Sequence, residues 1–219
     1  MDFSIETHRI KVSDNESISA EVYLPASPKA VFVFAHGAGA GMNHVFMTEL
    51  SQALASQQMI TLRYNFLYME QKKNRPDFPA VAHQAVAASV TKAIELFPGV
   101  PLFAGGKSFG GRMTSQLLAS VRDHNVKGII FVGFPLHPAG KPSVDRADHL
   151  RKIETPMLFL QGTKDALAEL SLLEGVCNSL PLASLVTLDG ADHAFKMPKQ
   201  KAIPLLSAHI SSWVNQINQ

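Results

Sequence analysis

The sequence predicts an α/β fold with a mainly parallel sheet of about six to eight strands and helices on both faces. Two observations predict it. Apolar runs such as residues 30–36 and 126–133 are continuous rather than alternating, as strands buried on both faces should be. Segments with apolar residues at helical spacing, such as residues 46–56, lie between these runs. Repeated strand–helix units place parallel strands side by side, with ligand sites at their carboxyl ends.

The elements follow one another in order along the chain. The strands are short apolar stretches bounded by Pro, Gly or polar residues, and they are expected at residues 18–24, 30–36, 60–64, 100–105, 126–133, 157–161 and 184–188. The helices are longer segments with apolar residues three or four apart, and they are expected at residues 46–56, 80–97, 111–119, 167–180 and 199–214. Residues 135–148 are irregular and rich in proline, which is too short a stretch for a lid domain.

Length and composition indicate one globular domain covering residues 1–219. The net charge of +2 and the absence of a basic block argue against a nucleic-acid partner. No cationic start leads into an apolar stretch, and no apolar run approaches the roughly 18 residues of a membrane span. Cys177 is the only cysteine, which excludes an internal disulfide and fits a reducing compartment. We therefore expect a cytoplasmic protein that acts on a small molecule.

A glycine-rich turn joins the strand at residues 100–105 to the helix that follows it. The turn reads Gly106-Lys107-Ser108-Phe109-Gly110, so a serine has glycine two residues away on each side. Strand, G-x-S-x-G and helix together form the nucleophile-elbow pattern. A phosphate-binding P-loop would instead need a glycine at position 101, where the chain has proline. Ser108 is therefore the expected nucleophile, and Lys107 is expected to point away from it.

A second glycine-rich loop follows the strand at residues 30–36. It reads His36-Gly37-Ala38-Gly39-Ala40-Gly41. Acyl transfer needs two backbone N–H donors aimed at the oxygen that becomes negative. The expected oxyanion hole combines the N–H of Phe109, which follows the nucleophile, with that of Ala38. A dinucleotide-binding loop would need glycine or alanine at position 42 or 44, where Met and His stand.

A serine nucleophile needs a base, and the base needs a carboxylate on its other nitrogen. In folds with a nucleophile elbow, these residues follow in the order Ser, Asp or Glu, His. Asp165 comes just after the strand at residues 157–161, and His193 just after the strand at residues 184–188. Both should therefore lie on the same sheet edge as Ser108. Asp192 is the second candidate for the orienting carboxylate.

The chain resembles the α/β-hydrolase superfamily over nearly its whole length. The resemblance rests on residues 35–40, 105–112, 133–138 and 191–193. They look like a compact subgroup related to dienelactone-hydrolase-like proteins, whose eukaryotic relatives include a non-specific-lethal complex subunit and testis-expressed hydrolase-like domains. The resemblance implies an α/β-hydrolase fold and a Ser-Asp-His triad, but it names no substrate. Dienelactone hydrolases proper carry a cysteine nucleophile, so Ser108 departs from their pattern.

Several residues near the predicted edge are candidates for substrate contacts. Lys141 and Arg146, in the short insert after residue 133, are able to bind a carboxylate or phosphate, or else form a solvated face. His137 lies in the same insert, and Tyr68 follows the strand at residues 60–64, where it would form a pocket wall or pack the loop. Without a lid, the site should be open.

The expected reaction is hydrolysis of a small ester or thioester through an acyl-enzyme. Ser108, His193 and Asp165 would form the triad, and no metal or organic cofactor is required. Acyl transfer or perhydrolysis on the same triad is a further reading of these residues. The alternative from another class is a catalytically silent α/β-hydrolase scaffold that binds other proteins.

Overall fold

The computed structural model describes residues 3–121, 125–198 and 200–219. One sheet of eight strands runs through the chain, in the order β1-β2-β4-β3-β5-β6-β7-β8. The strands are β1 Phe3–Lys11, β2 Ser17–Pro25, β3 Ala30–Ala35, β4 Met59–Tyr64, β5 Leu102–Lys107, β6 Val126–Val132, β7 Met157–Gly162 and β8 Ala183–Leu188. The first two strand pairs of the sheet, β1–β2 and β2–β4, are antiparallel, and all the others are parallel. The predicted α/β class and mainly parallel sheet are confirmed.

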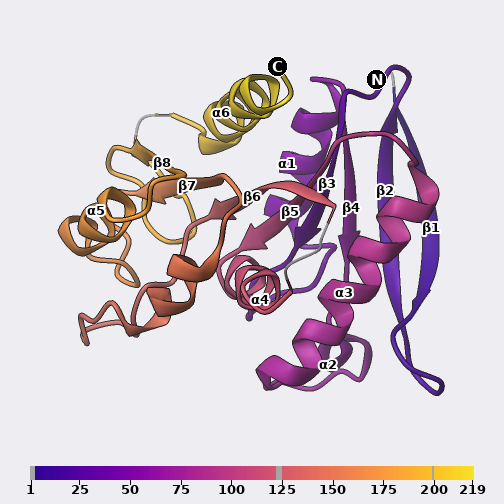
Figure 1. The fold of residues 1–219 in the computed structure, drawn as a ribbon, viewed down its shortest axis with the longest axis horizontal. Helices are drawn as coiled ribbons and strands as arrows, with labels where there is room; N and C mark the ends of the chain where they lie inside the picture. The colour runs from indigo at the N-terminus through magenta and orange to yellow at the C-terminus, as the bar shows by residue number, and fades with distance from the viewer. Residues whose placement is uncertain (1–2, 122–124, 199) are drawn as a thin grey trace.

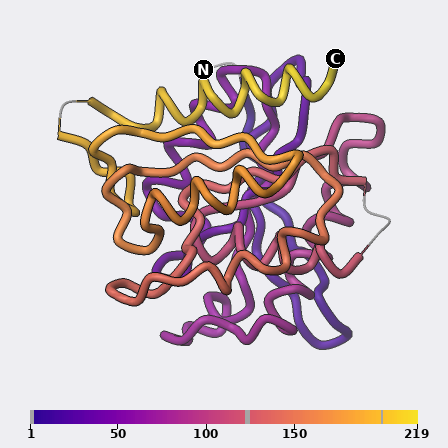
Figure 2. The backbone as a smooth tube through the Cα atoms, turned by 60° about the vertical axis from the view of Figure 1, so that its left-hand side comes forward, coloured from indigo at the N-terminus to yellow at the C-terminus, as the bar shows by residue number. Residues whose placement is uncertain are grey.

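Helices cover both faces of this sheet (Figure 1). They are α1 Val45–Ala55, α2 Leu67–Glu70, α3 Pro79–Leu96, α4 Phe109–Leu118, α5 Leu170–Asn178 and α6 Ala202–Ile217, with a 3-10 helix η1 at Asp145–Lys152. Helices α1 and α6 contact each other on one face, and α3 and α4 contact each other on the opposite face. In the tube view, α6 (yellow) runs along one side of the molecule (Figure 2), where it contacts β6 and β7.

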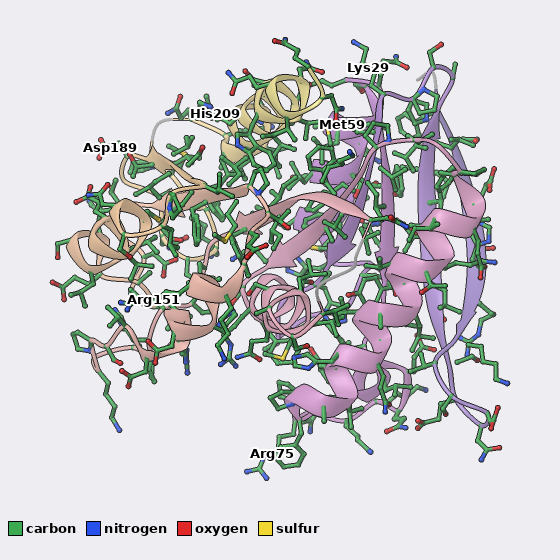
Figure 3. All side chains as sticks on the ribbon, viewed as in Figure 1. Lys29, Met59, Arg75, Arg151, Asp189 and His209 are labelled. Carbon is green, nitrogen blue, oxygen red and sulfur yellow. The ribbon has the colours of Figure 1, made fainter. Side chains whose placement is uncertain are left out.

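The alternation of side chains along each strand explains the continuous apolar runs. In β3, Val31 and Val33 belong to the core beneath α3 and α4, whereas Phe32 and Phe34 belong to the core beneath α1 and α6. Successive side chains of a strand point to opposite faces, so both sets must be apolar when helices cover both faces. Side chains fill the space between the helices and the sheet (Figure 3).

Three elements of the fold were not predicted from the sequence: β1, α2 and η1. Strand β1 lies at the sheet edge and most of its side chains are exposed, so it lacks the apolar face by which a strand is recognised. Helix α2 and helix η1 are too short to show helical periodicity. The connection from β6 to β7, residues 133–156, is fully described and contains η1 but no lid domain. Among the described residues, no helix has the length and apolar character to cross a membrane.

Candidate active site

Ser108 follows β5 in a backbone conformation that is rare for a residue with a side chain, with φ 49° and ψ −114°. Such a residue is held only where its surroundings impose the turn. A Cβ at Gly106 would lie 2.3 Å from the carbonyl oxygen of Ala35, and one at Gly110 would lie 2.6 Å from that of His36. The two flanking glycines therefore let the elbow pack directly against the end of β3.

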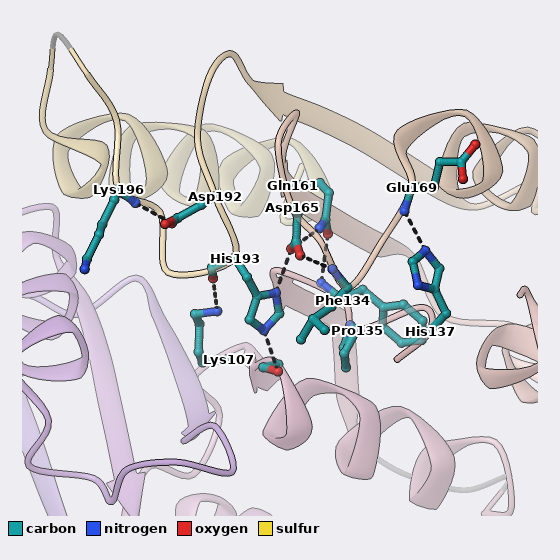
Figure 4. Close-up of polar contacts among 12 residues, drawn as sticks. Lys107, Phe134, Pro135, His137, Gln161, Asp165, Glu169, Asp192, His193 and Lys196 are labelled. Carbon is teal, nitrogen blue, oxygen red and sulfur yellow. Dashed lines mark hydrogen bonds and ion pairs between the residues drawn. The ribbon is translucent and has the colours of Figure 1, made fainter. Parts of the chain in front are cut away.

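The structure brings Ser108, His193 and Asp165 together at the carboxyl ends of β5, β8 and β7. Figure 4 shows the ring of His193 beside Asp165. His193 Nε2 lies 2.8 Å from Ser108 Oγ, and His193 Nδ1 lies 2.6 Å from Asp165 Oδ2. Because an ionised carboxylate only accepts hydrogen bonds, Nδ1 carries the proton and Nε2 is free to accept the serine proton. This is the arrangement that a serine nucleophile and its base require.

Asp165 is buried and fully engaged by neighbouring donors. Its Oδ1 accepts from the backbone N–H of Leu167 at 2.8 Å, and its Oδ2 also accepts from Gln161 Nε2 at 2.5 Å. Gln161 is buried, and its own Oε1 accepts from the N–H of Phe134 at 2.9 Å. The sequence analysis missed Gln161, whose only signal is a polar side chain at the end of the apolar run of β7.

Asp192 does not face His193 in the way that the alternative assignment required. Its Oδ1 accepts from the backbone N–H of Lys196 at 2.8 Å and closes the turn that follows His193 (Figure 4). The contacts of the histidine ring thus favour Asp165 over Asp192 as the orienting carboxylate.

The predicted oxyanion loop lies beside the nucleophile. The backbone N–H groups of Ala38 and Phe109 donate no hydrogen bond within the described part of the chain, so both are available to a ligand. Tyr68 holds the loop from behind, because its O–H donates to the carbonyl oxygens of Ala38 at 3.0 Å and Gly37 at 3.3 Å. Tyr68 is buried and packs edge-on to Phe109. It therefore contacts both sides of the predicted oxyanion hole rather than forming a pocket wall.

His36 anchors the same loop. Its Nε2 accepts from the N–H of Phe66 at 3.1 Å, and its Nδ1 donates to the carbonyl oxygen of Gly37 at 2.8 Å. This pattern needs a neutral ring with the proton on Nδ1. Burial lowers the pKa of His36 from 6.5 to about 4, and the hydrogen bond to Gly37 opposes the shift only in part.

Acidification should therefore destabilise the protein through His36. Its folded pKa lies below its unfolded value, so the unfolded chain binds more protons below pH 6.5 and stability is lost as the pH falls toward 4. We expect His36 to account for about 2 kcal/mol of lost unfolding free energy between pH 7 and pH 4.5. Urea unfolding of wild type and His36→Asn across this range measures the contribution of His36. It is the difference between the two proteins in how steeply the free energy of unfolding changes with pH.

The control for this measurement is His209→Asn, because His209 lies exposed on α6 (Figure 3). That variant should keep the wild-type slope. Equal slopes for wild type and His36→Asn would show that His36 does not titrate in the folded state as described.

A pocket of about 430 Å³ opens in front of Ser108 and His193. Apolar and small side chains form most of its wall, which is lined by His36, Gly37, Ala38, Gly39, Ala40, His44, Phe46, Met47, Lys107, Ser108, Leu167, His193 and Ala194. The loop after β3 and the start of α1 form one side, and the turn at His193 forms the other. The pocket is partly open to solvent.

Three predicted substrate contacts lie outside this pocket. His137 is buried, and its ring binds the carbonyl oxygen of Pro138 and the N–H of Glu169, so it joins two loops (Figure 4). Arg146 donates to the carbonyl oxygen of Pro135 at 3.3 Å. Lys141 is exposed. With both ring nitrogens of His137 occupied by backbone groups, its role is structural.

The sequence profile of a family described as an alpha/beta hydrolase domain matches residues 28–219. Two Mycobacterium tuberculosis proteins, provisionally named phosphoribosyl transferases, are each 24% identical over 188 residues, covering 83% of this chain and 40% of theirs. The chain thus spans less than half the length of the curated relatives it matches.

Two solved structures share the whole fold. A dienelactone hydrolase from Anabaena variabilis superposes with a TM-score of 0.79 at 18% identity, covering 99% of both chains. An α/β serine hydrolase without a lid, from Xanthomonas campestris, gives a TM-score of 0.71 at 16% identity, with 97% of this chain and 93% of that chain covered. These similarities agree with the fold that the sequence motifs implied.

Proposed function

The chain belongs to the family of alpha/beta hydrolase domains, and we propose that it is a serine hydrolase that cleaves a small ester or thioester through an acyl-enzyme. The observation that carries the proposal is the unbroken hydrogen-bonded series from Ser108 Oγ through His193 to Asp165, with distances of 2.8 and 2.6 Å. A nucleophile, a base and an orienting carboxylate that are hydrogen-bonded in this order perform acyl transfer in unrelated folds.

The reaction proceeds in two halves. Ser108 Oγ attacks the substrate carbonyl carbon while His193 Nε2 takes the hydroxyl proton, and the carbonyl oxygen becomes negative between the N–H groups of Ala38 and Phe109. His193 then gives the proton to the leaving alcohol or thiol, which leaves an acyl-enzyme. In the second half, water attacks the acyl-enzyme, His193 takes its proton, and the proton returns to Ser108 as the acid is released. Asp165 keeps the proton on Nδ1 throughout.

The pocket supports a small acyl group. Its volume of about 430 Å³ and its wall of Ala38, Ala40, Phe46 and Met47 fit a short apolar chain. Without a lid between β6 and β7, a larger leaving group is able to remain in solvent. The chemistry of the triad accepts both an oxygen and a sulfur leaving group, so esters and thioesters are the substrate classes to compare.

A fluorophosphonate probe tests the proposal directly, because it reacts with an activated serine. We expect labelling at Ser108, located by mass spectrometry, and turnover of p-nitrophenyl esters and acyl thioesters with short chains. Product analysis should find the free acid, which separates hydrolysis from acyl transfer to another acceptor. Folded protein that neither reacts with the probe nor turns over any short-chain ester or thioester would refute the proposal.

Tyr68→Phe should slow the reaction without weakening binding. The change removes the O–H that holds the carbonyl oxygens of Gly37 and Ala38. The Gly37 carbonyl and the Ala38 N–H lie in one peptide plane, so the Ala38 N–H becomes less well aimed at the developing oxyanion. We expect kcat to fall about tenfold with KM nearly unchanged, since the interaction matters in the transition state. Steady-state kinetics on a p-nitrophenyl ester measure the split.

Tyr23→Phe provides the matched control, because it removes a buried hydroxyl on β2 that binds Arg63 and not the oxyanion loop. Its kcat should stay within about twofold of wild type. A loss in KM rather than kcat for Tyr68→Phe would place the tyrosine in substrate binding instead.

A further inference from the structure

The turn that carries His193 is held in an unfavourable backbone conformation. Phe195, two residues after the histidine, has φ 62°, which is rare for a residue with a bulky side chain. Three hydrogen bonds close the turn. The N–H of Phe195 donates to the Asp192 carbonyl oxygen at 2.9 Å, the N–H of Lys196 to the Asp192 carboxylate at 2.8 Å, and the N–H of Asp192 to the Lys196 carbonyl oxygen at 3.2 Å. A strained turn persists only where its surroundings fix it.

Lys107 provides a contact from outside the turn. Its Nζ donates to the backbone carbonyl oxygen of His193 at 2.6 Å (Figure 4). The ammonium also lies 5.3 Å from the ring centroid of Phe195 and 6.0 Å from that of Phe46, and the two rings stack on each other. The side chain was expected to point away from Ser108, and it does so by crossing to the loop that carries the base.

Neither an ion pair nor apolar packing explains the buried position of the Lys107 ammonium group. Among the described residues, no carboxylate lies within ion-pair distance of Lys107. Burial lowers the pKa of Lys107 to about 8, although the more distant carboxylates of Asp165 and Asp192 oppose the shift. Burying a charge costs free energy, so an apolar side chain would serve better if packing were the only requirement. The hydrogen bond to His193 is what the lysine adds.

We propose that Lys107 is a positioning residue for the base, which holds the His193 carbonyl so that the imidazole stays within hydrogen-bond distance of Ser108. The proposal rests on the proposed function. Lys107 is the last residue of β5 and Ser108 is the next residue. The end of β5 thus positions the nucleophile Ser108 through its backbone and the base His193 through the Lys107 side chain. The distance between Ser108 and His193 therefore does not depend only on the long loop after β8.

Lys107→Met tests this, because methionine keeps an unbranched apolar chain and removes the donor. We expect kcat to fall by about 10- to 100-fold with KM within about threefold of wild type, since a small misplacement of the base affects the chemical step. The thermal midpoint should not fall in proportion, because the variant also removes a buried charge. Lys196→Met is the matched control: it lies exposed in the same turn, and its kcat should match wild type.

Chemical rescue separates positioning from packing. Lys107→Ala lacks three carbons and the amine, so propylammonium in the buffer should restore a measurable part of kcat by entering through the open pocket. Tetramethylammonium carries the same charge but no N–H donor and should not restore it. If Lys107→Met failed to fold, this comparison would carry the test.

The outcomes distinguish the two proposals. Wild type with Ser108-dependent turnover and a Lys107→Met variant within twofold of it would overturn the positioning role alone. Equal rescue by both ammonium ions, or a loss confined to KM, would overturn it as well. Wild type without turnover or probe labelling would instead refute the hydrolase itself.

Discussion

Ser108→Ala should lower kcat for a short-chain ester by about 10⁴-fold or more, the scale seen when a triad serine is removed. The substitution takes away the oxygen that forms the acyl-enzyme and leaves the rest of the pocket in place. Alanine keeps the Cβ, so the unusual φ of 49° remains and the fold should be retained. Steady-state kinetics, with circular dichroism and thermal melting to verify folding, measure the effect.

Ser120→Ala is the matched control for this variant. Ser120 is exposed just after α4, and its hydroxyl donates to the Leu117 carbonyl oxygen. Its kcat should equal that of wild type. Retained turnover in Ser108→Ala would mean that another group performs the chemistry. A protein that uses the fold only for binding would show no turnover before substitution, and its cellular role would survive Ser108→Ala.

Strands buried on both faces were predictable because burial on both faces requires an apolar residue at nearly every position. The runs that became β3 and β6 are apolar throughout, since helices cover both sides of the sheet. Strand β1 has no such apolar run, because only one of its side chains is fully buried. Its pairing with β2 holds it in the sheet. Its existence depends on the neighbouring strand rather than on its own residues.

The main residues of the site were predictable from the topology of the sheet. Parallel strands end at one edge, so Ser108, Asp165 and His193, each just past a strand, had to meet there. The supporting contacts were not predictable in this way. Lys107 donates to the carbonyl oxygen of His193, 86 residues away in the sequence, and Gln161 accepts from the N–H of Phe134, 27 residues away. Both contacts depend on the path of loops that lie far apart in the sequence, although Gln161 also donates to Asp165, four residues away.

The sequence also did not determine the contacts of Tyr68 and His137. Both lie near the edge where they were expected, but the direction of each side chain is set by which backbone carbonyls and N–H groups lack partners nearby. Buried polar groups must be satisfied, and these two residues satisfy loop backbone instead of contacting a substrate. A sequence shows that a residue follows a strand, but not which loop needs its hydrogen bonds.

Asp165→Asn should lower kcat by about 10⁴-fold while the protein remains folded, the loss known for a triad aspartate replaced by asparagine. Three donors converge on this carboxylate, from His193, Gln161 and Leu167. An amide has a single acceptor oxygen and adds an NH₂ group, so it cannot accept from all three. With the amide oxygen at the Oδ2 position, the NH₂ group faces the Leu167 N–H, and two donors oppose each other. With the NH₂ group at the Oδ2 position, it donates to His193 and forces the histidine proton onto Nε2, where the ring can no longer take the serine proton. We expect this second arrangement to account for the loss of activity.

Asp192→Asn tests whether the fall in kcat is specific to Asp165 or follows from losing any carboxylate near His193. The Asp192 oxygen accepts a hydrogen bond from the Lys196 N–H, and an amide oxygen can accept that bond equally well. Its kcat should therefore stay within about threefold of wild type, measured on the same ester and at the same pH. Equal losses in the two variants would mean that negative charge around His193 matters more than the tautomer, and the assignment of Asp165 as the orienting residue would then be wrong.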